Sequence, residues 1–209
     1  MSSKVRTISL LGIDGSGKST LSKSLKEYLE KLNFKVTIVP FHHWLFAHEL
    51  KTFFGKSIDR GRKSMDVPYR QKNYFSLSSI LKPIIAFIDN VFFYISKFPK
   101  DDNHIIIFDR FICSTQIKFR ALNYNNVWFK KLWTSFKTDK ILVFDVPEKI
   151  SVIRQIKRGD PYLYSLSELK YEREEYISYS KAHSGLIIDT STNDKESVLQ
   201  KVIKEINII

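Results

Sequence analysis

The amino-acid sequence predicts an α/β protein in which a five-stranded parallel sheet carries helices on both faces. Short, almost continuous apolar runs alternate along the chain with stretches of helical periodicity. Such runs are typical of strands that are buried on both faces. The alternation indicates a parallel sheet, because each connection between parallel strands must cross back over the sheet.

The first forty residues predict a strand, a loop, a helix and a second strand. The run at Thr7–Leu11 is apolar and ends at a glycine, as a buried strand before a tight turn would. From Lys18 onward the leucines recur at helical spacing, and Asn33 suits the helix end. The second strand shows the period of two that strands have; its alternating positions are Phe34, Val36, Ile38 and Pro40.

Three later apolar runs, at 105–108, 141–144 and 186–188, predict the remaining strands, and residues 195–206 predict a closing helix. The most apolar stretch, 84–98, is shorter than the roughly 20 residues that a bilayer span needs. Asp89 and Asn90 also interrupt it. We therefore interpret it as a buried helix and expect no membrane partner.

Length and composition indicate one soluble domain spanning residues 1–209. The chain has 209 residues, 43% of them hydrophobic, which is enough for one core and too few for two ordinary domains. Its single cysteine, Cys113, excludes an internal disulfide, and residues 1–6 hold no apolar signal-peptide core. We expect a cytoplasmic location.

The formal net charge of +12 favours anionic partners. The positive residues are spread along the chain and form no basic arm. Nucleic acid is therefore disfavoured as a partner. A small anionic substrate and a merely solvated basic surface both remain open from composition alone.

Residues 12–19, Gly-Ile-Asp-Gly-Ser-Gly-Lys-Ser, fit the phosphate-binding pattern G-x-x-x-x-G-K-[ST] without a mismatch. Glycines let a backbone adopt positive φ and approach a phosphate closely. The loop amides then form an anion site at a helix N-terminus. Lysine would reach the outer phosphates, and serine would offer a hydroxyl to Mg²⁺. The predicted ATP-binding residues are Gly12, Asp14, Gly15, Ser16, Gly17, Lys18, Ser19 and Thr20.

The strand in HIIIFDRF, residues 104–111, ends at Asp109, and Arg110 follows it. Ligands of open α/β sheets bind at the carboxyl ends of the strands. Asp109 could there hold a water of a Mg²⁺ shell, since Mg²⁺ usually keeps several waters. The planar fork of Arg110 could grip a second phosphate group.

Residues 152–176 predict two helices separated by a break at Gly159-Asp160-Pro161. Several cationic side chains flank the break, which is typical of a mobile lid that brings positive charge to a transferred phosphoryl group. We place this lid at about residues 154–173. Its cationic residues are Arg154, Lys157, Arg158 and Arg173.

Together, GIDGSGKST, FDRF and LVFDVPEKISVIRQIKRG resemble thymidylate kinase and its archaeal-type relatives. The resemblance covers residues 7–32 and 104–181 and is thin over 41–98. It implies a P-loop kinase fold and transfer of the ATP γ-phosphate, with Mg²⁺, to an acceptor such as deoxythymidine monophosphate (dTMP). Relatives are often dimers, so it also fits a homodimer.

The resemblance implies roles for individual residues. Asp14 would lie near the acceptor sugar, Arg110 would hold the acceptor phosphate, and Asp109, with Ser19, would organise Mg²⁺. Some family members carry a transition-state arginine in the P-loop, where this chain has Ser16, and others carry it in the lid. The lid must therefore supply it, and the candidates are Arg154 and Arg158, with Arg173 third.

The acceptor side departs from the family pattern. An arginine that often follows the second strand is replaced by Pro40-Phe41-His42-His43. The phenylalanine–arginine pair that reads thymine has no clear counterpart, although Tyr74 or Phe75 could stack on a base and Arg70 lies nearby in sequence. The base-facing positions of the helix after Arg110 become Ser114, Thr115, Lys118 and Phe119.

We therefore expect a thymidylate kinase-like phosphotransferase that uses ATP and Mg²⁺ and favours dTMP. Its expected catalytic residues are Lys18, Arg110, Arg154 and Arg158. One alternative is a related kinase with a different nucleotide or nucleoside acceptor. The other is a P-loop module that binds nucleotide without catalysis.

Overall fold

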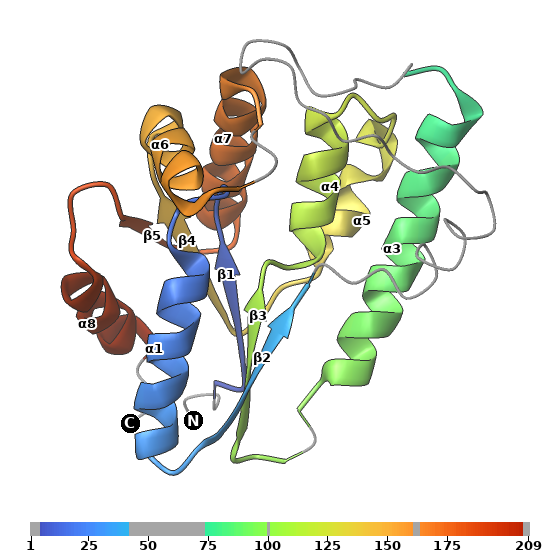
Figure 1. Cartoon of the computed structure of the whole chain (residues 1–209). Coiled ribbons are helices and arrows are strands. Elements are labelled where there is room, and N and C mark those ends of the chain that lie inside the picture. The colour runs from blue at the N-terminus through green and yellow to red at the C-terminus, as the bar shows by residue number, and fades with distance from the viewer. Residues whose placement is uncertain (1–4, 42–73, 100, 161–163, 207–209) are drawn as a thin grey trace.

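The computed structural model describes residues 5–41, 74–99, 101–160 and 164–206. Within them a five-stranded parallel sheet has the order β2-β3-β1-β4-β5 (Figure 1). Each predicted apolar run forms the centre or the whole of a strand, so the predicted α/β architecture is confirmed. The strands are β1 Thr7–Leu11, β2 Lys35–Pro40, β3 His104–Asp109, β4 Lys140–Asp145 and β5 Leu186–Asp189.

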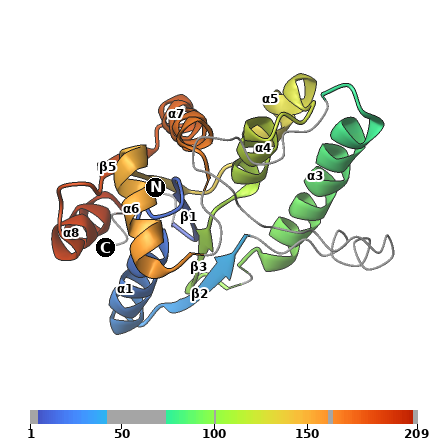
Figure 2. The same ribbon diagram turned by 45° about the horizontal axis from the view of Figure 1, so that its top comes forward.

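Helices cover both faces of the sheet. Figures 1 and 2 show α1 and α8 on one face and α3, α4, α5 and α7 on the other. A short 3-10 turn, η1, precedes α5. The bounds are α1 Lys18–Lys31, α3 Leu77–Lys97, α4 Ile112–Ala121, η1 Val127–Phe129, α5 Lys130–Ser135, α6 Glu148–Arg158, α7 Leu166–Ala182 and α8 Lys195–Ile206.

The two faces bury separate apolar clusters, because successive side chains of a strand point to opposite sides of the sheet. Ile8 and Leu10 of β1 pack with the leucines of α1 and with Val198 and Val202 of α8. Leu11 belongs to the opposite cluster, which is closed by side chains of α3, α4, α5 and α7. This packing fixes the helices around the carboxyl edge of the sheet.

The strand order gathers the predicted site residues at that edge. β1 lies between β3 and β4, with Leu10 in register with Asp109 and Leu11 in register with Val143. The loop after β1 therefore leaves the sheet beside the end of β3. Residues far apart in sequence are brought to one place by pairing of parallel strands.

Helix α3 is buried on one face only, so the interpretation of residues 84–98 as a buried helix is wrong for the other face. Ala86 and Phe93 are buried, whereas Phe92 is 61% exposed and Ile95 is 64% exposed. The helix spans 21 residues and is, by length and composition, apolar enough to cross a membrane. Helices in the cores of soluble proteins pass the same test, so this is weak evidence for a span.

Candidate active site

The glycines of residues 12–19 shape the loop between β1 and α1. Gly12 has φ 135° and Gly15 has φ 81°, values that side-chain-bearing residues rarely adopt. Space excludes a side chain as well, since an added Cβ would lie 2.5 Å from the carbonyl oxygen of Phe144 at Gly12 and 2.7 Å from that of Ser151 at Gly15. The loop is thus held tightly against β4 and α6.

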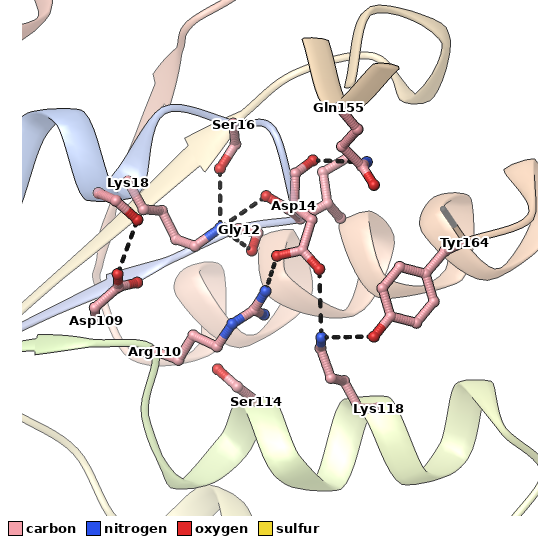
Figure 3. Close-up of polar contacts among 12 residues, drawn as sticks. Gly12, Asp14, Ser16, Lys18, Asp109, Arg110, Ser114, Lys118, Gln155 and Tyr164 are labelled. Carbon is pink, nitrogen blue, oxygen red and sulfur yellow. Dashed lines mark hydrogen bonds and ion pairs between the residues drawn. The ribbon is translucent and has the colours of Figure 1, made fainter. Parts of the chain in front are cut away.

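Lys18 is buried at the start of α1 and turns back onto the loop (Figure 3). Its Nζ donates to the carbonyl oxygens of Gly12 at 2.9 Å and Ile13 at 2.7 Å, and contacts Ser16 Oγ at 3.3 Å. Burial lowers the pKa of Lys18 to about 7, helped by the charge of Arg110 and opposed by nearby carboxylates. A phosphate group carries full negative charge, whereas the carbonyl oxygens carry only partial charge. The ammonium group of Lys18 would therefore bind a phosphate more strongly than it binds these carbonyls.

Ser19 and Asp109 meet at the end of β3, where Ser19 Oγ donates to Asp109 Oδ2 at 3.0 Å. Hydroxyl and carboxylate oxygens are ligands that Mg²⁺ accepts. The described residues contain no cluster of three or more histidine, cysteine or acidic side chains that could form a metal cage. The pair fits a Mg²⁺ ion that keeps its waters and takes phosphate oxygens.

The carboxylate of Asp14 forms ion pairs with two cationic side chains, Arg110 and Lys118 (Figure 3). Its Oδ1 accepts a hydrogen bond from Arg110, and its Oδ2 accepts one from Lys118 Nζ at 3.5 Å. Burial would raise the pKa of Asp14, but the charges of Arg110, Lys118 and Lys18 outweigh it and hold the pKa below its ordinary value. Asp14 is therefore ionised across the neutral range.

Arg110 is fixed by its backbone and by both ends of its guanidinium group. Its φ is 76°, unusual for a residue with a side chain, and it is 4% exposed. One terminal nitrogen donates to Asp14 and the other to Tyr176 Oη at 3.3 Å. A strained, buried arginine at the end of a strand indicates a functional position.

The P-loop, the end of β3 and Arg158 at the end of α6 line one cavity of about 180 Å³. Most of the predicted phosphate- and metal-binding residues line it, whereas Gly12, Ser16 and Arg154 are not among its lining residues. The lining residues are Asp14, Gly15, Gly17, Lys18, Ser19, Thr20, Asp109, Arg110 and Arg158. The predicted donor and acceptor residues thus face the same space.

The two predicted lid helices are α6 and α7, and α6 ends at Gly159. Arg154 donates to the carbonyl oxygens of Gly15 at 3.3 Å and Thr190 at 2.7 Å, so it braces the P-loop. Arg158 is an exposed side chain that pairs with Asp160. Of the three candidate lid arginines, Arg158 is the one that lines the cavity.

Arg173 is held away from the cavity. It forms ion pairs with Asp145 at the end of β4 and with Glu148 at the start of α6. The carboxylate of Asp145, the other acid at a strand end, thus accepts from a cation, whereas the carboxylate of Asp109 accepts from the hydroxyl of Ser19. We therefore interpret Arg173 as a link between α7 and β4.

The residues predicted to face or stack on the base lie in different surroundings. Phe119 packs in the core against Tyr124, with ring centroids 4.7 Å apart, and Lys118 contacts Asp14. Tyr74 and Phe75 pack on each other before α3, and neither lines the cavity. The predictions for His42, His43 and Arg70 lie outside the described residues.

Three side chains near Asp14 were missed by sequence reasoning. Tyr164 accepts a hydrogen bond from Lys118 at 3.2 Å, Tyr176 contacts Arg110, and Glu172 is 1% exposed in the same cluster. One signal could have found two of them. Glu172 and Tyr176 are four residues apart on α7 and so share a helix face.

Several known proteins resemble this chain in sequence. The KAP family P-loop domain matches residues 2–60, which supports the P-loop. A probable thymidylate kinase of Saccharolobus solfataricus is 27% identical over 204 residues, covering 95% of each chain. A thymidylate kinase of Mycoplasma mobile is 28% identical over 185 residues, covering 83% of this chain and 81% of the relative.

Solved structures share the fold. Thymidylate kinase from Ehrlichia chaffeensis superposes with a TM-score of 0.59 at 20% identity, covering 97% of this chain and 98% of that one. Deoxyadenosine kinase from M. mycoides gives a TM-score of 0.58 at 16% identity, with 97% and 100% coverage. The chain thus has the α/β fold of a P-loop kinase, and its sequence resembles thymidylate kinases along nearly its whole length.

Proposed function

We propose that the protein is an ATP- and Mg²⁺-dependent nucleoside monophosphate kinase that favours dTMP. The observation that carries the proposal is the shared cavity. P-loop, Asp109, Arg110 and Arg158 line the same space, so a phosphate donor and a phosphate acceptor can meet there. Kinases act chiefly by positioning the two groups and neutralising charge.

On the donor side, the loop amides and Lys18 would bind the ATP phosphates. Lys18 would leave the carbonyl oxygens of Gly12 and Ile13 for the outer phosphates. Mg²⁺ would lie against Ser19 and a water held by Asp109, and when bound it would neutralise charge on the phosphate oxygens. Thr20, which also lines the cavity, would contact the α-phosphate.

On the acceptor side, Arg110 would hold the monophosphate in line, and Asp14 would accept a hydrogen bond from the sugar. A phosphate oxygen is already nucleophilic, so no general base is needed. Arg158 would approach the transferred phosphoryl group as the lid closes, because its exposed side chain already lines the cavity. Arg154, bonded to Gly15, would support the loop and steady the lid.

The preference for dTMP rests on the relatives named thymidylate kinase. The deoxyadenosine kinase among the structural neighbours was solved with the products dCMP and dCDP bound, which favours testing other acceptors too. A nucleotide-binding module without catalysis is the second alternative. It would bind ATP and leave every acceptor unchanged.

The test is ADP production from ATP and Mg²⁺, with each common nucleoside and deoxynucleoside monophosphate offered in turn. Turnover with dTMP above all others supports the proposal. Turnover with another acceptor would support a kinase activity and would exclude dTMP as the favoured acceptor. ATP binding without turnover, in protein whose Lys18→Ala variant has lost ATP binding, would select the binding-module alternative.

We also propose that the protein forms a homodimer through the exposed face of α3. Apolar side chains recur there every three or four residues, the spacing of a helix seam, at Leu81, Ile85, Ile88, Phe92 and Ile95. Sedimentation velocity should show a dimer, and Ile88→Glu with Phe92→Glu should give a folded monomer. A monomeric wild-type protein would exclude this interface.

A further inference from the structure

We propose that Lys118 is a second cationic ligand of the acceptor's phosphate group, working beside Arg110. This inference rests on the proposed function, because it assumes a nucleoside monophosphate in the acceptor site. Sequence reasoning placed Lys118 among base-facing positions. The structure instead brings its ammonium group to the same carboxylate that holds Arg110.

The charges around Asp14 leave a surplus of positive charge. One carboxylate faces two full cations, Arg110 on Oδ1 and Lys118 on Oδ2. The charge of Asp14 can compensate only one of them. Burial raises the pKa of Glu172, the other carboxylate of this cluster, and so disfavours a second negative charge there. A phosphate monoester, which carries about −1.5 to −2 charges at pH 7 and three acceptor oxygens, is the group that matches such a surplus.

Lys118 is the more movable of the two cations. Its side chain is 27% exposed, against 5% for Arg110. The Lys118–Asp14 contact is long, at 3.5 Å, whereas Arg110 is held at both ends by Asp14 and Tyr176. The flexible lysine can therefore shift toward a phosphate group that Arg110 would also contact.

Lys118 stays protonated despite losing bulk water. Burial and the charge of Arg110 would lower the pKa of Lys118, but Asp14 and Glu172 raise it above its ordinary value. Glu172 is 1% exposed, and neither of its oxygens has a hydrogen-bond partner among the described residues. Glu172 lies close enough to favour the charged form of Lys118, although burial disfavours its own ionisation.

An ammonium group has three hydrogens to donate. Asp14 and Tyr164 receive two of them, with Tyr164 Oη at 3.2 Å. The third is available to a phosphate oxygen without breaking the tyrosine contact. Tyr164 would then hold the lysine beside Asp14.

The experiment is titration calorimetry with dTMP and with thymidine, which differ by the phosphate group alone. The variants are Lys118→Met, which removes the charge, and Lys118→Arg, which keeps it. Lys130→Met is the matched control, because the ion pair of Lys130 is with Glu175, whereas that of Lys118 is with Asp14. Unfolding temperatures verify that each variant is folded.

We expect Lys118→Met to weaken dTMP binding about ten- to a hundredfold, the usual loss for a hydrogen bond to a charged group. Thymidine and ATP binding should stay within about twofold, and Lys118→Arg should recover part of the dTMP affinity. The loss should shrink as salt rises. Lys130→Met should bind dTMP like the wild type.

Equal losses for dTMP and thymidine would overturn the proposal, because Lys118 would then act on the sugar, on the base or only on the fold. Unchanged dTMP binding in Lys118→Met would overturn it as well, while leaving the kinase proposal intact. Wild-type protein that binds ATP but none of the common nucleoside monophosphates would refute both. Should Lys118→Met fail to fold, Lys118→Gln replaces it in the same comparison.

Discussion

Ser19 and Asp109, 90 residues apart in sequence, are joined by a hydrogen bond of 3.0 Å at the start of α1 and the end of β3. The bond connects the P-loop helix with the strand that precedes Arg110, which we propose as a ligand of the acceptor phosphate. Ser19 and Asp109 are the two side chains that we propose would hold Mg²⁺.

Asp109→Asn should raise the Mg²⁺ concentration for half-maximal activity about 10- to 100-fold, the usual effect of losing a group that orients a metal's ligands. The amide keeps the size but loses the negative charge. Asp145→Asn is the control, because Asp145 is paired with Arg173. Mg²⁺ titration of ADP production checks both, and equal Mg²⁺ requirements would exclude Asp109 from the metal site.

ATP binding at pH 8 should take up about one proton through Lys18. Burial lowers the pKa of the free lysine to about 7, so most molecules lack that proton at pH 8. Phosphate charge raises the pKa again once ATP is bound. Calorimetry in two buffers with different ionisation enthalpies measures the uptake.

The control for this proton uptake is the same titration at pH 6, where Lys18 is already charged and the uptake through it should vanish. Tight ATP binding at pH 8 without proton uptake would contradict the prediction. It would mean that the hydrogen bonds to Gly12 and Ile13 keep the lysine charged in the free protein.

We expect substitution of Arg158 to lower kcat and substitution of Arg173 to lower the free energy of unfolding. Arg158→Gln should lower kcat about 10³-fold or more, the range for an arginine that stabilises a phosphoryl transition state. Its unfolding temperature should not change, since its pair with Asp160 is exposed. Steady-state kinetics and thermal unfolding measure the two effects.

Arg173→Gln should do the opposite, because its ion pairs connect α7 with Asp145 and Glu148. We expect a loss of about 1 kcal/mol in the free energy of unfolding, for partly exposed pairs, with kcat kept within a few-fold. A large fall in kcat for Arg173→Gln, beside an unchanged value for Arg158→Gln, would reverse the assignment.

Glu172→Gln should stabilise the protein at pH 8 and not at pH 4. Burial raises the pKa of Glu172 above its ordinary 4.5, against the opposing charges of Lys118 and Arg110. The folded state thus favours the protonated acid, and its contribution to stability is lost as the pH rises from the unfolded pKa through the folded one. Glutamine does not ionise, so the Glu172→Gln variant should not lose this stability as the pH rises.

The gain at pH 8 should be about 1 kcal/mol or more, the cost of an unsatisfied buried polar group. Denaturant unfolding at both pH values measures it. Glu168→Gln is a comparison on the same helix, where the carboxylate caps α7 by accepting from Ser165, and it should destabilise. A less stable Glu172→Gln at pH 8 would mean that ionised Glu172 stabilises Lys118 more than its burial costs.

The sequence predicted the strands to within two residues at each end, because a strand buried on both faces must be apolar throughout. It failed on α3, whose apolar residues were all assigned to the core. Phe93 is buried and Phe92 is 61% exposed, although both are phenylalanine. Periodicity shows that a helix has faces, but the neighbours decide how many of them are covered.

By itself, the sequence determined the P-loop, since glycine spacing, Lys18 and Ser19 act within one turn of backbone and need no distant partner. Only the tertiary structure decided the charge cluster at Asp14, whose cations lie 96 and 104 residues away. It likewise decided that Arg158 faces the cavity while Arg173 serves Asp145. Contacts of this kind depend on which strands pair and which helix faces meet, and long-range burial fixes both.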